Sequence, residues 1–147
     1  MKKILVFFVI IGVLACILTH ITSTANAPPV QGGALPVINL PIPKNFDEKD
    51  YLGLSGDGQF KIPQIKAKLV IVEIFSMYCP FCQKEAPRIN ELYQVIESNP
   101  ELKTKIKLIG IGAGNSPYEV SVFKKTYAVP FPFFRIRILS FIRLMER

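Results

Sequence analysis

Residues 69–82 read LVIVEIFSMYCPFC, and this stretch decides the fold class. The β-branched run at 69–75 predicts a buried strand at the centre of a sheet, covered on both faces. Residues 76–79 predict a turn, and the apolar spacing from 80 to about 97 predicts a helix that Pro87 should kink. The side of this helix expected to face the core carries Ile89, Leu92, Val95 and Ile96.

The segments on both sides of this stretch predict further short elements. A second buried strand is expected at 106–111, a second helix at 117–127 with Ser116 as its cap, and a third extended segment at 129–134. Upstream, extended pieces are expected at 35–40 and 60–62, with turn chemistry over 47–59 between them. The alternation of strands and helices predicts an α/β class with at least partly parallel pairing.

The motif Cys79-Pro80-Phe81-Cys82 carries the chemistry. Free backbone N–H groups at a helix N-terminus favour the Cys79 thiolate, and the two-residue spacing lets Cys82 resolve a mixed disulfide on Cys79. A structural disulfide remains an alternative, although so short a loop stabilises little. Zinc would need two more ligands, and the other Cys and the single His both lie near the N-terminus; covalent haem would need His at position 83, where Gln stands.

Residues 70–87, VIVEIFSMYCPFCQKEAP, resemble the active-site region of thioredoxin-fold proteins, and are most similar to the exported TlpA-like and ResA-like thiol–disulfide oxidoreductases. The matching positions are Phe75, Tyr78, Cys79, Cys82, Glu85 and Pro87. Tyr78 replaces the usual Trp but keeps a flat ring beside the sulfurs. A weaker resemblance extends over residues 35–134. It implies a thioredoxin-like central sheet flanked by helices, with Cys79 attacking, Cys82 resolving, and Pro80 and Phe81 supporting the pair.

Two carboxylates are candidates for handling protons at this site. Glu73 lies on the predicted strand, where thioredoxins place a buried acid; burial should raise its pKa and fit it to relay protons for Cys82. A strand-edge glutamate that reaches solvent is the alternative. Glu85 lies one helical turn after Cys82. The resemblance implies that it tunes the cysteines, and an ordinary solvated helix residue is the alternative.

The last part of the chain departs from the thioredoxin pattern. That fold normally supplies a cis-proline beside the cysteine pair, and Val129-Pro130 is the one candidate by residue type. Alternatively, residues 127–134, YAVPFPFF, match an earlier segment of the family, and the expected Asp and Gly turn chemistry does not follow. We favour this second interpretation, which predicts a fold incomplete at its C-terminus. The alternative for residues 135–147 is a terminal amphipathic helix.

The N-terminus predicts export. Lys2 and Lys3 precede an apolar run at 4–18, and small residues with a possible cleavage site at 25–27 follow. The run could also remain as a membrane anchor, and Cys16 is a weaker candidate for lipidation. All three options place the body outside the cytoplasm, in the periplasm or on the outer face of the membrane. The expected organisation is a leader at 1–27, a Pro/Gly-rich linker with an edge strand at 28–58, a thioredoxin-like domain at 59–134 and a basic tail at 135–147.

Composition excludes other classes of function. Of the 147 residues, 50% are hydrophobic and 20% charged, which excludes wholesale disorder. The net charge of +7 is concentrated at the two ends, since residues 28–134 hold twelve cations against ten acids. No nucleic-acid partner is therefore expected. The glycines at 110, 112 and 114 do not form the dinucleotide fingerprint, so no cofactor is expected either.

The sequence thus predicts an exported thiol–disulfide oxidoreductase. Its partners would be protein thiols and disulfides together with an upstream redox protein. Two alternatives remain. One is a peroxiredoxin-like peroxidase, for which Ser76 and Cys79 faintly fit the Thr-x-x-Cys pattern while Val72 stands in place of its proline. The other is an inactive, incomplete redox domain tethered to a membrane.

Overall fold

The structure is a computed structural model that describes residues 32–33 and 37–136. In chain order its elements are β1 (Asn39–Pro41), α2 (Phe46–Leu52), β2 (Gln59–Lys61), the 3-10 turn η1 (Ile62–Gln64), β3 (Leu69–Phe75), α3 (Pro80–Ser98), α4 (Leu102–Lys105), β4 (Ile106–Ala113), α5 (Pro117–Thr126) and β5 (Phe133–Ile136). β1 and β2 form an antiparallel pair, and β3, β4 and β5 form a parallel sheet in that order. The predicted α/β class with parallel strands is confirmed.

β4, rather than β3, is the middle strand of the sheet in the described part of the chain. β3 pairs with β4 from Leu69 opposite Ile106 to Phe75 opposite Gly112, and β5 pairs with the other edge of β4. The sequence placed the central strand at 69–75, and this is wrong for the described residues: β4 carries five consecutive buried residues, whereas β3 carries one. A β-branched run predicts a strand, but it does not indicate whether that strand pairs with one neighbouring strand or with two.

Glycines in β4 make room for side chains on one face of the sheet. A Cβ atom at Gly110 would overlap the Phe133 ring, and one at Gly112 would lie 2.9 Å from the Val120 side chain. Real contacts between carbon atoms are longer than this, so only glycine fits at either position. Gly110 and Gly112, two of the three alternating glycines in the sequence, therefore serve packing between β4, β5 and α5.

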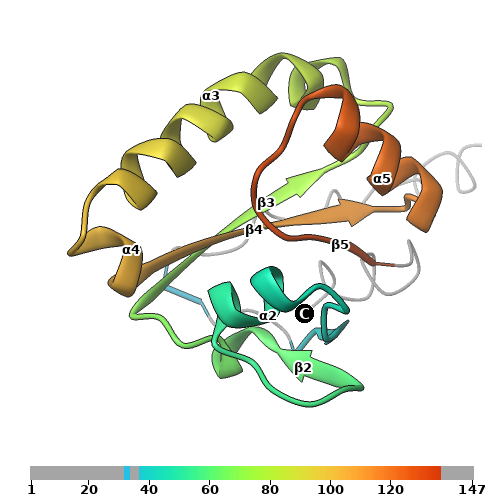
Figure 1. Cartoon of the computed structure of the whole chain (residues 1–147). Coiled ribbons are helices and arrows are strands. Elements are labelled where there is room, and N and C mark those ends of the chain that lie inside the picture. Colours follow the sequence, from blue (N-terminus) through green and yellow to red (C-terminus); the bar gives the residue numbers. More distant parts are fainter. Residues whose placement is uncertain (1–31, 34–36, 137–147) are drawn as a thin grey trace, which may run out of the picture. The chain divides into compact units, whose positions relative to one another are not determined.

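The aromatic side chains on this face form one cluster between the sheet, α3 and α5. Figure 1 shows these two helices on the same side of the sheet. The Phe75 ring lies 4.6 Å from Phe123 and 4.4 Å from Phe133, measured between centroids, and Phe131 lies 5.2 Å from Phe133. Rings at these separations add directional attraction to the free energy of burying their area. The cluster holds the C-terminal end of β3 against both helices, directly before the turn that leads to Cys79.

α2, with β1 and β2, covers the other face of the sheet (Figure 1). The expectation of turns over 47–59 is wrong in its first half, because α2 occupies Phe46–Leu52. The Asn45 side chain caps this helix by accepting a bond from the Asp47 N–H at 2.8 Å. Gly53 ends the helix with φ at +64°, in the left-handed region that favours glycine. Seven residues are too few for their apolar period to be recognised in the sequence.

α3 and α5 lie where the sequence predicts them, but only some of the α3 side chains that were expected to face the core do so. α5 begins at Pro117 with Ser116 as its cap, as predicted, and α3 runs through Pro87 as one helix without restarting there. Of the four residues expected on the core side of α3, Ile96 is buried and Ile89 packs partly against the aromatic cluster. Leu92 and Val95 are exposed, at 39% and 59% of their surface. Tyr93 takes their place by packing on Phe131.

Several expectations lie outside the described residues. The leader at 1–27, including Cys16, and the tail beyond residue 136 are among them. Arg135 and Ile136, assigned by the sequence to the tail, belong to β5. Among the helices that the structure describes, none is both long enough and apolar enough to span a bilayer.

Candidate functional site

Cys79 is the N-cap residue of α3 and lies just beyond the C-terminal end of strand β3. Its backbone is extended, with φ at −87° and ψ at 111°, and Pro80 then begins the helix with the φ that proline already prefers. The Cys79 sulfur accepts a bond from the Cys82 backbone N–H at 3.4 Å, and the Gln83 N–H bonds the Cys79 carbonyl at 3.1 Å. The helix N-terminus therefore directs its free N–H groups at the Cys79 sulfur, as the spacing predicted.

The two thiols differ in acidity because they stand in different surroundings. Hydrogen bonding from the Cys82 thiol and from its backbone N–H lowers the pKa of Cys79. Desolvation by burial raises the pKa of Cys82, and the hydrogen bond with Cys79 adds to this. Both side chains are partly exposed, and both are free thiols. Cys79 is thus the more readily ionised thiol, and Cys82 keeps its proton to higher pH. Thiol–disulfide exchange uses such a pair, because the thiolate is the form that attacks.

Glu73 lies two residues before the end of β3 and is half-buried. Desolvation raises its pKa from 4.5 to about 7. Its charge also contributes to the raised pKa of Cys82, which places the carboxylate within electrostatic range of that thiol. The expectation that burial raises the pKa of Glu73 is confirmed.

Glu73→Gln is expected to stabilise the chain above pH 7 by about 1–2 kcal/mol, which is less than the full equivalent of the pKa change because solvent screens this half-buried carboxylate. The pKa of Glu73 is higher in the folded than in the unfolded chain. Protonated Glu73 therefore makes its full contribution to the free energy of unfolding below about pH 4.5, and this contribution is lost as the pH rises through 7 and the buried carboxylate ionises. Gln carries no charge, so the variant should not lose this stability. Urea unfolding at pH 4, 6 and 8.5 measures this. Glu91→Gln, at an exposed position of α3, is the control. A stability difference independent of pH would contradict the prediction.

Tyr78 is tied to α5 through Glu119, a residue that the sequence analysis did not single out. The Tyr78 hydroxyl donates to Glu119 Oε1, and the other oxygen, Oε2, accepts from the Ser116 N–H at 2.6 Å. The Tyr78 bond lowers the pKa of Glu119, so the carboxylate is held ionised. The S-x-x-E capping pattern at 116–119 could have indicated the second contact but not the first. The Tyr78 ring is largely exposed beside Cys79.

The remaining predicted site residues lie at the surface. Phe81 is 80% exposed on the first turn of α3. Glu85 pairs with Arg88 at 3.0 Å, and no contact to either cysteine is found for it among the described residues. Pro130 is exposed in the connection between α5 and β5 and follows a trans peptide bond. The structure therefore brings Cys79 and Cys82 together, with Glu73 within electrostatic range of Cys82, whereas Tyr78 adjoins Cys79 in the chain and directs its hydroxyl to Glu119.

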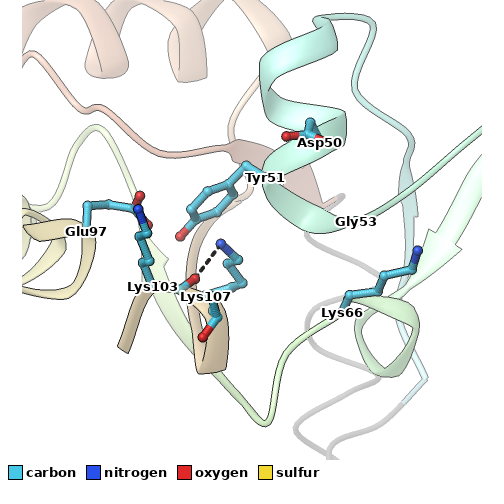
Figure 2. A pocket seen from close by; sticks show the side chains of 8 residues that line it. Asp50, Tyr51, Gly53, Lys66, Glu97, Lys103 and Lys107 are labelled. Carbon is cyan, nitrogen blue, oxygen red and sulfur yellow. Dashed lines mark hydrogen bonds between the residues drawn. The ribbon is translucent and has the colours of Figure 1, made fainter. Parts of the chain in front are cut away.

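A separate pocket of about 450 Å³ opens between α2 and the C-terminal end of α3 (Figure 2). It is lined by Asp50, Tyr51, Gly53, Lys66, Glu97, Lys103, Thr104 and Lys107. The Lys107 ammonium lies 4.2 Å from the centre of the Tyr51 ring and donates to the Lys103 carbonyl at 2.8 Å. The pocket contains no sulfur and lies near the start of β4, whereas the cysteine pair follows the end of β3. The described residues hold no group of His, Cys, Asp or Glu suited to a metal ion.

Comparison with known proteins places these features in context. No family model matches the chain. It is 31% identical over 75 residues to the thiol-disulfide oxidoreductase ResA of Bacillus cereus, covering 50% of the chain and 40% of ResA. The chain thus spans well under half the length of this relative.

Solved structures resemble the fold. The thioredoxin domain of a thiol-disulfide oxidoreductase from Bacteroides vulgatus aligns with a TM-score of 0.56 at 13% identity, over 82% of this chain and 71% of that domain. A thioredoxin-family thiol:disulfide interchange protein from Chlorobium tepidum TLS aligns with a TM-score of 0.50 at 21% identity, over 82% and 68%. At these identities the likeness establishes the fold.

Proposed function

Because the chain is a thioredoxin-fold protein similar to ResA, we propose that it catalyses thiol–disulfide exchange through Cys79 and Cys82. The observation that carries the proposal is the placement of the Cys79 sulfur at the N-terminus of α3, three residues from Cys82, with opposite pKa shifts on the two thiols. Exchange needs one thiolate to attack and one thiol to resolve the mixed disulfide, and the opposite pKa shifts support assigning Cys79 to the first role and Cys82 to the second.

In the reductive direction, the Cys79 thiolate attacks one sulfur of a partner's disulfide and displaces the other as a thiolate. This forms a mixed disulfide. Cys82 then loses its proton and attacks the Cys79 sulfur, so that the partner leaves with two thiols and the pair is left as a disulfide. The half-buried Glu73 carboxylate, with its pKa near 7, is suited to accept the Cys82 proton at neutral pH. The pair regains two electrons and two protons from a dithiol of an upstream redox protein.

The partners in this proposal are protein disulfides and dithiols outside the cytoplasm. Support for export comes from the charged start and apolar run of the N-terminal residues, which match a signal peptide or an anchor. Disulfide chemistry on partner proteins is common in such compartments. Glu85 is proposed to modulate the pair from its place one turn after Cys82.

The proposal is tested by insulin reduction with dithiothreitol as the electron donor, run beside a hydrogen peroxide consumption assay on the full chain. Faster insulin reduction with no peroxide consumption above the dithiothreitol background is the expected result. Peroxide consumption without insulin reduction would replace the proposal with a thiol peroxidase. The absence of both activities from a folded chain would favour an inactive redox domain.

A further inference from the structure

The backbone of Met77, in the turn that precedes Cys79, is held by two side chains from different elements. Its N–H donates to Asn115 Oδ1 at 3.2 Å, and its carbonyl accepts a bond from Gln83 Nε2 at 2.7 Å. Gln83 belongs to α3, and Asn115 belongs to the loop between β4 and α5. Both hydrogen-bonding groups of this one residue are therefore satisfied by side chains.

This arrangement sets the path by which the chain enters α3. The Cys79 N–H bonds the Ser76 carbonyl at 3.0 Å, so Met77 lies inside a closed turn that ends at the cysteine. If the Met77 backbone rotates, the turn changes and Cys79 moves relative to the first N–H groups of the helix. The bond from the Cys82 N–H to the Cys79 sulfur, at 3.4 Å, depends on that placement.

Asn115 is buried at this point although a polar side chain is costly to bury. It is 5% exposed, and its Nδ2 group makes no hydrogen bond of ordinary length among the described residues, although the Asn115 amide is near enough to Glu119 to help lower the pKa of that carboxylate. An apolar side chain of the same shape would avoid this desolvation cost, but it could not accept the Met77 N–H. Gly112 leaves the space, since a Cβ atom there would lie 3.2 Å from Asn115 Oδ1. The bond to the Met77 N–H is thus one reason for a polar side chain at this buried position.

We propose that Asn115 is a positioning residue that, together with Gln83, fixes the Met77 turn and thereby holds the Cys79 sulfur against the N-terminus of α3. The consequence for catalysis rests on the proposed exchange activity, whereas the effect on Cys79 itself does not. Asn115 acts through Met77 and does not contact the reacting sulfurs. Groups that influence the ionisation of Cys79 or of its partner thiol are Cys82 on α3 and Glu73 on β3, and none of them is changed in the test.

The test is the rate of alkylation of Cys79 by iodoacetamide between pH 5 and 10 in Asn115→Leu, with the modified peptide quantified by mass spectrometry so that each cysteine is counted separately. The midpoint of the profile should move upward, and the rate at pH 7 should fall about threefold or more as thiolate is lost. Asn90→Leu is the matched control. Asn90 also bonds a backbone group, since its Nδ2 donates to the Tyr127 carbonyl at 2.8 Å, and its Oδ1 is a buried atom without a partner among the described residues.

The control separates positioning from a general loss of stability. Both variants should unfold at lower urea concentrations, but the profile of Asn90→Leu should match the wild type. Equal shifts in the two variants, or none in Asn115→Leu, would overturn the proposal. Gln83→Leu removes the other bond from a partly exposed position and provides the same measurement if Asn115→Leu does not fold; an unchanged profile there would also overturn it.

Insulin reduction distinguishes this proposal from the proposed function. A wild-type chain that reduces no insulin, with an alkylation shift in Asn115→Leu, would retain the positioning role and lose the exchange activity. A wild-type chain that reduces insulin, with an unshifted Asn115→Leu profile, would retain the activity and lose the positioning role.

Discussion

Cys79→Ser is expected to lower the rate of insulin reduction by about a thousandfold or more, to the level of dithiothreitol alone. A serine hydroxyl at the N-cap of α3 can still accept the helix N–H bonds that the sulfur accepts, so the fold should be retained. It is not ionised at neutral pH and cannot form a disulfide, so the group proposed to attack is lost. The measurement is the initial rate of insulin precipitation, with the urea midpoint recorded to show that the variant folds.

Cys82→Ser is the companion variant that assigns the order of the two thiols. Cys79 can still attack a partner, but the mixed disulfide is not resolved from within, so the variant should accumulate a covalent complex that dithiothreitol releases. The double variant, with both cysteines replaced by serine, should form none. A Cys79→Ser chain that keeps full activity, or that forms the complex through Cys82, would contradict the assignment.

Phe75→Ala is expected to lower the free energy of unfolding by about 3–5 kcal/mol. Phe75 is 2% exposed and contacts Phe123 and Phe133 in the aromatic cluster, so the truncation leaves a cavity between the sheet and α5. Since a small domain is stable by only about 5–15 kcal/mol, this loss would consume much of its stability. Urea unfolding followed by far-ultraviolet circular dichroism measures the change.

Phe46→Ala is the matched control, because Phe46 is 78% exposed at the start of α2. The same atoms are removed, but little area leaves contact with the protein, and the effect should stay within about 0.5 kcal/mol. If both variants lost a similar amount of the free energy of unfolding, the aromatic cluster would not be a main source of the stability of this domain.

The sequence predicted the elements with strong local signals. Residues 69–75 match β3 from its first residue to its last, because a β-branched run bounded by polar residues is unambiguous. The start of α5 was correct because Ser116 and Pro117 form a cap and a first turn whose geometry is set locally. The place of Cys79 at the start of α3 followed from the same kind of signal, with Pro80 as the first helical residue.

Features that depend on contacts between distant segments could not be predicted in this way. The central place of β4 depends on β5 pairing with it, and the room that its glycines leave is taken by side chains of β5 and α5, which lie far along the sequence. Leu92 and Val95 fit the helical period, but the side of α3 that faces the core is determined by the aromatic cluster on which the helix packs. The bonds from Glu119 to Tyr78 and from Asn115 to Met77 span about 40 positions, and no spacing rule reports them.

The carboxylate of Glu119 adds a second hydrogen-bonded link, beside the bond from Met77 to Asn115, between the start of α5 and the turn before Cys79. One oxygen closes the first turn of α5 and the other holds Tyr78, so the start of that helix cannot fray without releasing the residue next to Cys79. Local openings in proteins occur as cooperative units, whose sizes are set by such shared contacts. In native-state hydrogen exchange, the Ser116 amide and the Cys79 amide should therefore exchange with a common opening free energy. The turn at residues 76–79 and the start of α5 would then open together. A partner that orders Tyr78 on binding would therefore also slow amide hydrogen exchange at the start of α5.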